Sequence, residues 1–387
     1  MRELLARLGN PERAFRVVLV GGTNGKGSTA RALARIMQAA GERVGLFTSP
    51  HLLSVCERIE VDGVPIGKGT LERWLDLLAD DLEAVGASYF EALAALALAY
   101  FAGRRVQTAV LEVGLGGRFD AVNVTEPELS IITNVSLDHT DWLGPTLAHI
   151  AREKAGILRP GKPALTAAQG LGRKLLAEAA RERGALLEQV APVHVSLHGY
   201  GVSFMYAGNV YYAPLMGRHQ AANIALALRA AGLMGVSDAA MQEGLLELRH
   251  PGRLEYRSAE RLLLDGAHNP AGARTLAQAL ADYFPASSRA LVFAVSRDKD
   301  IAGLAAALRP VFNSVWLTGY PAERSASPAE LLPHFPGAMQ EADPLRALAA
   351  ARAARPPGGL VVVAGSLYLL AALLRAEAGL PPEEMSQ

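Results

Sequence analysis

The segment Gly21–Ser28, with the sequence GGTNGKGS, is rich in glycine and carries one lysine. It follows the β-branched run Val17–Val20 and precedes the helical pattern Thr29–Ala40, so it would connect a strand to a helix N-terminus. Backbone N–H groups in such a loop can surround phosphate oxygens, and Lys26 would place a positive charge near the β- and γ-phosphates. A plain glycine-rich turn is the alternative, but this context favours nucleotide binding. The residues expected to contact the nucleotide are Thr23, Asn24, Gly25, Lys26, Gly27 and Ser28.

The position after Lys26 is Gly27, which has no hydroxyl group. In the usual phosphate-binding loop, a Ser or Thr at this position helps to hold a Mg²⁺ ion. The ion would therefore need an oxygen ligand from elsewhere. Ser49 is the first candidate, because it follows the strand pattern Arg43–Phe47 and the carboxyl ends of parallel strands converge on the ligand. Ser28 is the second candidate, although it could also cap the helix.

Glu112 ends the apolar run Val106–Glu112 and precedes several glycines. A carboxylate at the buried end of a strand is costly unless it is paired with a cation or bound to a metal. An ion pair with Arg118 is the structural alternative. The glycines would let a ligand approach the backbone, so we interpret Glu112 as a metal ligand.

Asp138 and His139 follow the strand pattern Leu129–Thr133. A lone histidine is more often a hydrogen-bonded structural residue than a ligand. Because this strand should neighbour the phosphate loop, we interpret His139 as a ligand. Lys154 lies near the end of a predicted helix, and its local sequence indicates only a solvated charge or a partner of the helix dipole.

These residues would be positioned by strands that alternate with helices, which predicts a mainly parallel sheet covered on both faces. From Val193 to Pro214, short strands separated by Gly-Tyr-Gly and Gly-Asn predict antiparallel hairpins. The further helices expected in this half are Leu71–Ala84, Glu91–Phe101, Thr146–Gly156, Gln220–Ala231 and Ala239–Leu248.

A second α/β series begins after His250-Pro251-Gly252, where the helical pattern is interrupted. We therefore predict an α/β protein with a doubly wound parallel sheet of the P-loop NTPase type over residues 1–249. A smaller Rossmann-like domain would occupy residues 250–387. The strands expected in the second domain are Leu262–Leu264, Ala290–Ala294, Ser314–Leu317 and Leu360–Val363.

The composition narrows the class of protein. Apolar residues make up 50% of the 387 residues and the net charge at pH 7 is zero, so the chain is globular and lacks the basic excess of a nucleic-acid-binding protein. We expect no membrane span, because the most apolar stretches are too short. The single cysteine and the absence of a signal peptide favour the cytoplasm. The chain has only 6 lysines among its 38 basic residues, which makes each lysine worth examining.

Taken together, these residues resemble the folylpolyglutamate synthase/dihydrofolate synthase family, within the Mur ligase superfamily of ATP-dependent amide ligases. The resemblance runs in order along nearly the whole chain. The matching segments are GGTNGKGS, TSPHL, SYFEAL, LEVGLGGRFDAVN, NVSLDHTDWLGPT, REKAGIL, GRHQAAN, PGRLE, DGAHNPAG, SRDKD and GSLYL.

The resemblance implies a role for each matching residue. Lys26 and the loop amides would hold ATP, while Ser49, Glu112 and His139 would be ligands of two Mg²⁺ ions. Lys154 matches a lysine that is carbamylated in the superfamily, so that it becomes an anionic ligand; arginine cannot be converted in this way. The remaining ATP contacts implied are Asn223, Arg253, Asp265 and His268. Lys299 is a family position without an assigned role.

The resemblance also implies a pterin pocket that includes Ser88, Phe90, Asp120 and Ala121. Phe90 would stack on the ring and Asp120 would accept hydrogen bonds from an aminopyrimidine edge. Alternatively, Phe90 belongs to the core. Only 20 residues precede the phosphate loop, fewer than in the leader of some bifunctional members. Dihydrofolate synthesis is therefore left open.

The implied reaction is the ATP-dependent addition of L-glutamate to a carboxylate of folate or dihydropteroate through an acyl phosphate, by a monomer. A Mur-type ligase acting on a UDP-muropeptide is the nearest alternative. A P-loop kinase or motor ATPase would leave the DGAHNP half unexplained. A non-catalytic nucleotide-binding regulator would not need Glu112, His139 and Lys154.

Overall fold

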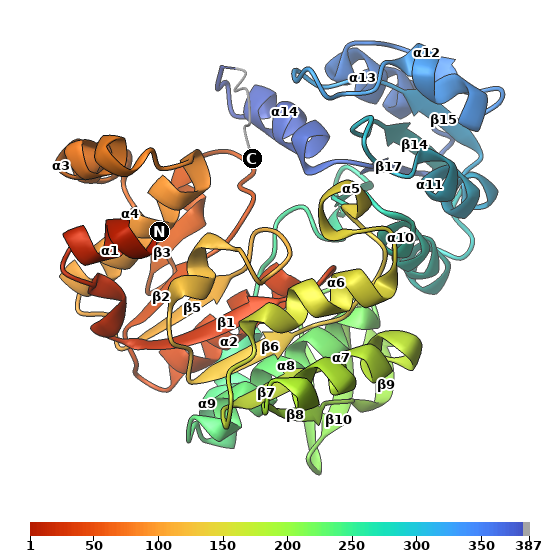
Figure 1. The fold of residues 1–387 in the computed structure, drawn as a ribbon. Coiled ribbons are helices and arrows are strands. Elements are labelled where there is room, and N and C mark those ends of the chain that lie inside the picture. The colour runs from red at the N-terminus through yellow and green to blue at the C-terminus, as the bar shows by residue number, and fades with distance from the viewer. Residues whose placement is uncertain (382–387) are drawn as a thin grey trace.

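The computed structural model describes residues 1–381, which form two α/β units (Figure 1). The first unit is built on an eight-stranded sheet in the order β4-β3-β2-β5-β1-β6-β7-β8. All neighbours from β2 to β8 are parallel, whereas β3 and β4 form an antiparallel edge. The strands are β1 (Arg16–Gly21), β2 (Val44–Phe47), β3 (Ile59–Val61), β4 (Val64–Pro65), β5 (Thr108–Glu112), β6 (Leu129–Ile132), β7 (Pro163–Thr166) and β8 (Leu186–Gln189).

The central strands are buried on both faces, which explains their nearly continuous apolar sequence. Along β1, Val17 and Leu19 point into one hydrophobic core and Val18 and Val20 into the other, because successive side chains of a strand alternate. One core is covered by α1 (Arg2–Arg7), α3 (Lys68–Val85), α4 (Tyr89–Gly103), α6 (Leu147–Lys154) and α7 (Gly170–Glu182). The other is covered by α2 (Lys26–Ala39), α8 (His219–Leu233) and α9 (Asp238–Leu246). The predicted doubly wound sheet is confirmed.

The predicted hairpins are also confirmed. A three-stranded antiparallel sheet joins β9 (Val193–His198), β10 (Gly201–Tyr206) and β11 (Asn209–Ala213). The turn between β10 and β11 has positive φ at both Ala207 and Gly208, as the tight turn of a twisted hairpin requires.

The second unit contains a six-stranded sheet in the order β12-β13-β17-β14-β15-β16, in which only β12 is antiparallel to its neighbour. Its strands are β12 (Glu255–Arg257), β13 (Leu262–Asp265), β14 (Arg289–Phe293), β15 (Ser314–Leu317), β16 (Met339–Gln340) and β17 (Leu360–Ala364). Its helices are α10 (Pro270–Tyr283), α11 (Ile301–Leu308), α12 (Pro328–Leu331), α13 (Pro344–Ala354) and α14 (Leu367–Glu377). All four predicted strands of this half are present. The predicted boundary at residue 250 falls in the connection between α9 and β12.

Several predicted helix limits were wrong by two or three residues; for example, α3 begins at Lys68 rather than Leu71, and α9 ends at Leu246 rather than Leu248. Two of the differences have a local cause. The helix expected from Thr29 begins at Lys26, because Gly25 adopts a left-handed conformation (φ 87°) that turns the loop directly into α2. The helix expected to reach Gly156 ends at Lys154 and continues as a 3₁₀ turn, Ala155–Ile157. Gly156 lies so close to Arg118 that a Cβ atom there would overlap it. No helix within residues 1–381 is long and apolar enough to span a membrane.

Candidate active site

The phosphate loop, Ser49, Glu112 and His139 all follow the carboxyl ends of neighbouring strands. The loop follows β1, Ser49 follows β2, Glu112 ends β5 and His139 follows β6. Because β2, β5, β1 and β6 are adjacent in the sheet, these four segments meet at the side of the sheet where the parallel strands have their carboxyl ends. The sequence therefore predicted correctly which elements build this side of the sheet.

The phosphate loop is held in a fixed conformation by the segment after β6. The N–H of Thr23 donates to the Asn134 carbonyl at 3.1 Å, and the N–H of Asn24 donates to Asn134 Oδ1 at 3.0 Å. Gly25 packs directly on Asn223 of α8, and a Cβ atom there would overlap the amide. Thus Asn223, predicted to contact ATP, packs against the loop, and its Nδ2 donates to Gln220 Oε1 at 3.0 Å.

Lys154 lies at the end of α6, and its ammonium group reaches the phosphate loop. Its Nζ donates to the Gly22 carbonyl at 2.9 Å, and only 4% of the residue is exposed. Burial, followed by the positive charge of Lys26, lowers the pKa of Lys154 to about 7. A solvated helix charge, which the local sequence indicated, is therefore wrong.

Glu112 is buried beside Ser49 in a small pocket of about 60 Å³. Its Oε2 accepts a hydrogen bond from the Ser49 N–H at 3.2 Å, and the alternative ion pair with Arg118 does not form within residues 1–381. Burial raises the pKa of Glu112, and the charge of Lys26 opposes this shift. Arg253, from the second unit, lines the same pocket.

A divalent cation fits this chemistry. Within the part of the chain that is described, no three His, Cys, Asp or Glu residues cluster as a metal site. Mg²⁺ is commonly held by one or two carboxylates together with substrate phosphates and water, so a complete protein cage is not needed. A buried carboxylate next to Ser49 and beside Gly27 of the phosphate loop provides such a partial set of oxygen ligands.

His139 lies beyond this pocket, next to residues of the second unit. Its Nε2 is 3.3 Å from Lys299 Nζ, and burial lowers the pKa of His139 to about 4. The neutral imidazole is the form that can bind a metal ion. The sequence did not predict the contact with Lys299.

Asp138, which the sequence did not select as a site residue, connects the two units. Its Oδ1 is 3.0 Å from Lys299 Nζ, its Oδ2 accepts from Asn269 Nδ2 at 2.8 Å, and His268 Nε2 lies 3.7 Å away. Burial alone would raise the pKa of Asp138, but the hydrogen bond and charge of His268, with the charge of Lys299, hold it well below its usual range. These partners lie at least 130 residues away, so no local pattern revealed them.

Two other predicted residues of the second unit, Asp265 and His268, lie at and after the end of β13. Both oxygens of Asp265 accept backbone hydrogen bonds, from Leu254 N–H at 2.8 Å and Ala267 N–H at 2.9 Å. His268 Nδ1 is 2.8 Å from the Gly266 carbonyl, so Nε2 is directed at Asp138. Asp265 therefore fixes the loop that carries His268.

The four residues predicted for the pterin pocket lie on α4 and on the loop after β5. Ser88 caps α4 with Glu91, and Phe90 packs on Phe47 with ring centroids 5.7 Å apart. Asp120 accepts from the N–H groups of Leu115 and Val122, and Ala121 begins a short 3₁₀ turn. Burial raises the pKa of Asp120 to about 6. Phe90 is half-buried against the core, as in the alternative interpretation, and leaves part of its ring accessible.

His250, which served only to mark a boundary in the sequence, also reaches the phosphate loop. Its Nδ1 is 2.9 Å from Ser28 Oγ, and the ring lines the pocket that contains Glu112. Its place three residues before Arg253, in the motif that continues as PGRLE, was the only signal in the sequence.

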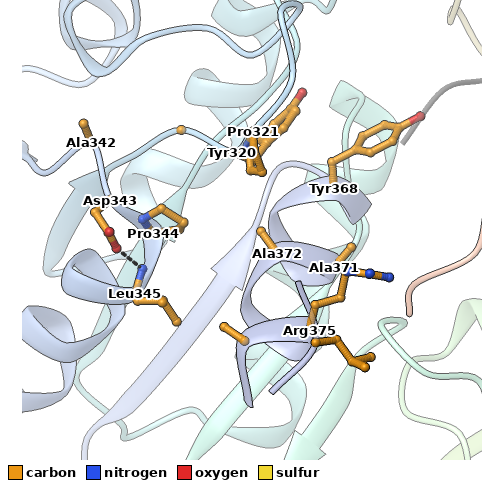
Figure 2. Close-up of a pocket in the computed structure, with 13 residues that line it drawn as sticks. Tyr320, Pro321, Ala342, Asp343, Pro344, Leu345, Tyr368, Ala371, Ala372 and Arg375 are labelled. Atoms are coloured by element: carbon orange, nitrogen blue, oxygen red, sulfur yellow. Dashed lines mark hydrogen bonds between the residues drawn. The ribbon is translucent and has the colours of Figure 1, made fainter. Parts of the chain in front are cut away.

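A larger cavity, of about 480 Å³, lies in the second unit between α14 and the N-terminus of α13 (Figure 2). Tyr320 and Tyr368, which stack with ring centroids 5.7 Å apart, contribute to its wall, and Asp343 caps α13 through the Leu345 N–H. None of the predicted site residues lines it, so cavity size alone would have pointed away from the phosphate loop.

Comparison with known families matches both units. The description "Mur ligase middle domain" matches residues 20–231 and "Mur ligase, glutamate ligase domain" matches residues 252–367. Among curated proteins, the chain is 39% identical over 354 residues to the dihydrofolate synthase/folylpolyglutamate synthase of Mycobacterium tuberculosis, covering 81% of this chain and 72% of the relative. It is 33% identical to the Bacillus subtilis protein of the same name, covering 96% of this chain and 92% of the relative.

Solved structures give the same result. M. tuberculosis folylpolyglutamate synthase complexed with ADP and AMPPCP aligns with a TM-score of 0.91 at 33% identity, covering 99% of this chain and 95% of that one. Escherichia coli FolC in complex with DHPP and ADP aligns with a TM-score of 0.89 at 32% identity, covering 97% and 92%. A Yersinia pestis bifunctional folylpolyglutamate synthase/dihydrofolate synthase complexed with AMPPNP and Mn aligns with a TM-score of 0.88 at 33% identity, covering 98% and 92%.

Proposed function

The chain belongs to the Mur ligase family, in its folylpolyglutamate synthase/dihydrofolate synthase branch, and on this basis we propose which of its residues carry out the reaction of that branch. It is an ATP-dependent ligase that joins L-glutamate to a folate carboxylate. We base the residue assignment on one observation. Glu112 and Lys154 lie close to the phosphate loop that carries Lys26, at the carboxyl ends of the strands.

The reaction proceeds in two steps. An oxygen of the substrate carboxylate attacks the γ-phosphorus of ATP, the bond to the β,γ-bridging oxygen breaks, and an acyl phosphate and ADP form. The amine of L-glutamate then attacks the acyl carbon, loses a proton, and expels phosphate from a tetrahedral intermediate to leave an amide. In polyglutamylation, the accepting carboxylate is the γ-carboxyl of the terminal glutamate.

Lys26 and the N–H groups at the start of α2 bind the phosphates and stabilise the charge on the transferring phosphoryl group. Arg253, which lines the pocket that contains Glu112, supplies a second positive charge. Thr23 and Asn24 are held by Asn134, so the loop does not have to reorganise when ATP binds.

Two Mg²⁺ ions would be held by Ser49, Glu112, His139 and a modified Lys154 together with the phosphate oxygens. When bound, they neutralise phosphate charge and align the transferring group. The oxygen ligands and the neutral imidazole described above fit this ion, and the Y. pestis relative was crystallised with Mn and AMPPNP.

We infer that Lys154 is carbamylated. A pKa of about 7 leaves a large fraction of its amine neutral at physiological pH, and a neutral amine is required to attack CO₂. The nitrogen forms a bond to the carbon of CO₂ and releases a proton, which converts the buried cation into an anion. Such an anion would relieve its repulsion with Lys26.

The folate or dihydropteroate would enter between α4 and the loop after β5. Phe90 presents the accessible part of its ring there, and Asp120 holds the loop through its backbone bonds. Ser88 is exposed, and it is positioned by its bonds to Glu91 at the N-terminus of α4. We expect the protein to act as a monomer.

A glutamate-incorporation assay tests this proposal and its alternative. Purified protein with ATP, Mg²⁺ and labelled glutamate is given dihydropteroate, tetrahydrofolate or a UDP-muropeptide in parallel. We expect incorporation with tetrahydrofolate, and incorporation with dihydropteroate would establish the second activity. Incorporation only with the UDP-muropeptide would instead make the protein a cell-wall ligase. ATP hydrolysis that is independent of glutamate would favour a motor-type ATPase.

A further inference from the structure

The side chain that a common phosphate-binding loop carries after its lysine is missing here, and His250 lines the space that it leaves. A Cβ atom added to Gly27 would lie 3.2 Å from His250 Nε2 and 3.4 Å from Glu112 Oε2. His250 belongs to the connection between the two units and lies 223 residues after Gly27 in the chain. Its ring therefore forms part of the wall of the pocket that contains Glu112.

The two ring nitrogens of His250 have different surroundings. Nδ1 lies 2.9 Å from Ser28 Oγ, and this is the only side-chain hydrogen bond that either residue makes within residues 1–381. Nε2 makes no hydrogen bond in the same part of the chain and lies at the pocket that Glu112, Ser49 and Arg253 also line. One edge of the ring is thus fixed, and the other remains available to a ligand.

The hydrogen bond between His250 and Ser28 is compatible with a proton on either ring nitrogen. Burial and the charges of Arg31 and Arg253 lower the pKa of His250, so the ring is neutral and has one donor and one acceptor. In one of the two tautomers the hydroxyl of Ser28 donates to Nδ1 and the proton is on Nε2, the nitrogen nearest to Gly27. A ring N–H is suited to a phosphate oxygen, because a hydrogen bond to a charged acceptor is stronger than one to a neutral acceptor.

We propose that His250 is a further ATP-binding residue of this ligase, whose Nε2–H donates a hydrogen bond to a phosphate oxygen of ATP while Ser28 holds the ring through Nδ1. This rests on the proposed assignment of the phosphate loop to ATP. The imidazole occupies the space beside Gly27 where another loop would carry a side chain, while the Mg²⁺-binding role of that side chain stays assigned to Ser49. If His250 had a purely structural role, its hydrogen bond to Ser28 would be sufficient, because that bond joins the connection between the units to α2.

Two substitutions separate these roles, because each preserves a different edge of the imidazole. In His250→Gln the amide nitrogen can reach the position of Nε2, whereas in His250→Asn the shorter amide lies near the position of Nδ1 and can still bond Ser28. We expect H250N to lower kcat/KM for ATP at least tenfold and H250Q to stay within about threefold of the unaltered protein. A hydrogen bond to a charged group accounts for an effect of this size. KM for glutamate and for folate should not change in either variant.

The reverse order, with H250N active and H250Q impaired, would overturn the proposal, as would equal kcat/KM values for ATP in both variants. Midpoints of thermal unfolding show whether each variant is folded. The unaltered protein serves as the control for the proposed function, because absence of glutamate-dependent ATP use there would contradict that function and not the role of His250.

A measurement on the unaltered protein keeps the test independent of folding. In protein labelled with ¹⁵N-histidine, we expect His250 Nε2 to carry the proton and its resonance to shift when Mg²⁺ and AMPPCP are added. H250Q identifies the resonance. A proton on Nδ1, or an Nε2 resonance that AMPPCP leaves in place, would refute the contact.

Discussion

Lys299 Nζ lies 3.0 Å from Asp138 Oδ1, and this ion pair joins the second unit to the segment after β6. Both side chains are largely buried, with 11% and 7% of their surface exposed. Asn269 and His268, also from the second unit, surround the same carboxylate. One aspartate of the first unit is therefore bound by three residues of the second, directly beside His139.

We predict that this pair stabilises the association of the units. A double-mutant cycle with Lys299→Met and Asp138→Asn, followed by chemical denaturation, should give a coupling free energy of about 1–3 kcal/mol. Each single substitution should destabilise the protein, because it leaves a buried charge without its partner. Lys68→Met is the control, because Lys68 is 84% exposed and its pair with Glu72 should contribute less than about 0.5 kcal/mol. Additive effects would show that the pair is not coupled.

Lys26→Ala should abolish ATP-dependent glutamate addition, with a loss of at least about a hundredfold in kcat. The phosphate loop has no second lysine that could stabilise the negative charge of the transferring phosphoryl group. Labelled-glutamate incorporation into tetrahydrofolate measures this loss. Lys174→Ala, on the exposed side of α7, should retain full activity. Ligase activity retained in K26A would rule out the assignment of this loop to ATP.

Lys154→Ala should be nearly inactive and should regain part of its activity when a short carboxylic acid such as acetate is added, because the acid can occupy the space of the carbamate. Lys154→Arg should be inactive and should not respond to bicarbonate, since a guanidinium group is not carbamylated. Mass spectrometry of the intact protein in bicarbonate provides a second measurement. Full activity of K154A without any additive would contradict the carbamate.

Removal of divalent metal with a chelator should stop the reaction, and Mg²⁺ should restore it. Glu112→Gln should raise the Mg²⁺ concentration needed for half-maximal activity by at least about tenfold, because the amide keeps the shape of the carboxylate but not its charge. The variant should remain folded, because Gln removes a buried charge. An unchanged Mg²⁺ dependence in E112Q would exclude Glu112 as a ligand.

His51 should contribute to a loss of stability in mild acid, together with the other histidines whose pKa burial lowers, His139, His219 and His250. His51 is 3% exposed and accepts a hydrogen bond from Arg58 Nε at 2.9 Å, and burial lowers its pKa to about 4. The unfolded chain binds a proton near pH 6.5 and the folded chain only near pH 4, so stability is complete above pH 6.5 and is lost as the pH falls toward 4. Unfolding midpoints at pH 7 and pH 5 should differ less in His51→Asn than in the unaltered protein. An equal difference in both would show that His51 does not carry the effect.

The sequence by itself predicted the central strands of the first sheet, the hairpins, four strands of the second sheet and the elements that meet at the phosphate loop, whereas β3, β4, β7, β8, β12 and β16 were not predicted. Apolar runs such as Val106–Glu112 and glycine-rich segments such as Gly21–Ser28 are local signals, and a parallel sheet brings its carboxyl ends together whatever the details. The resemblance of ordered motifs then identified the family, and the comparisons confirmed it.

Only the tertiary structure decided which polar groups are bound to one another. Asp265 and Asp120, which look like free carboxylates in the sequence, are occupied by backbone N–H groups of their own loops. Asp138 and His250 carry no periodic signal, yet they contact Lys299 and Ser28 across more than 150 residues. Such contacts depend on how the second unit is placed on the first, and that placement results from packing between distant segments, which no local pattern of residues records.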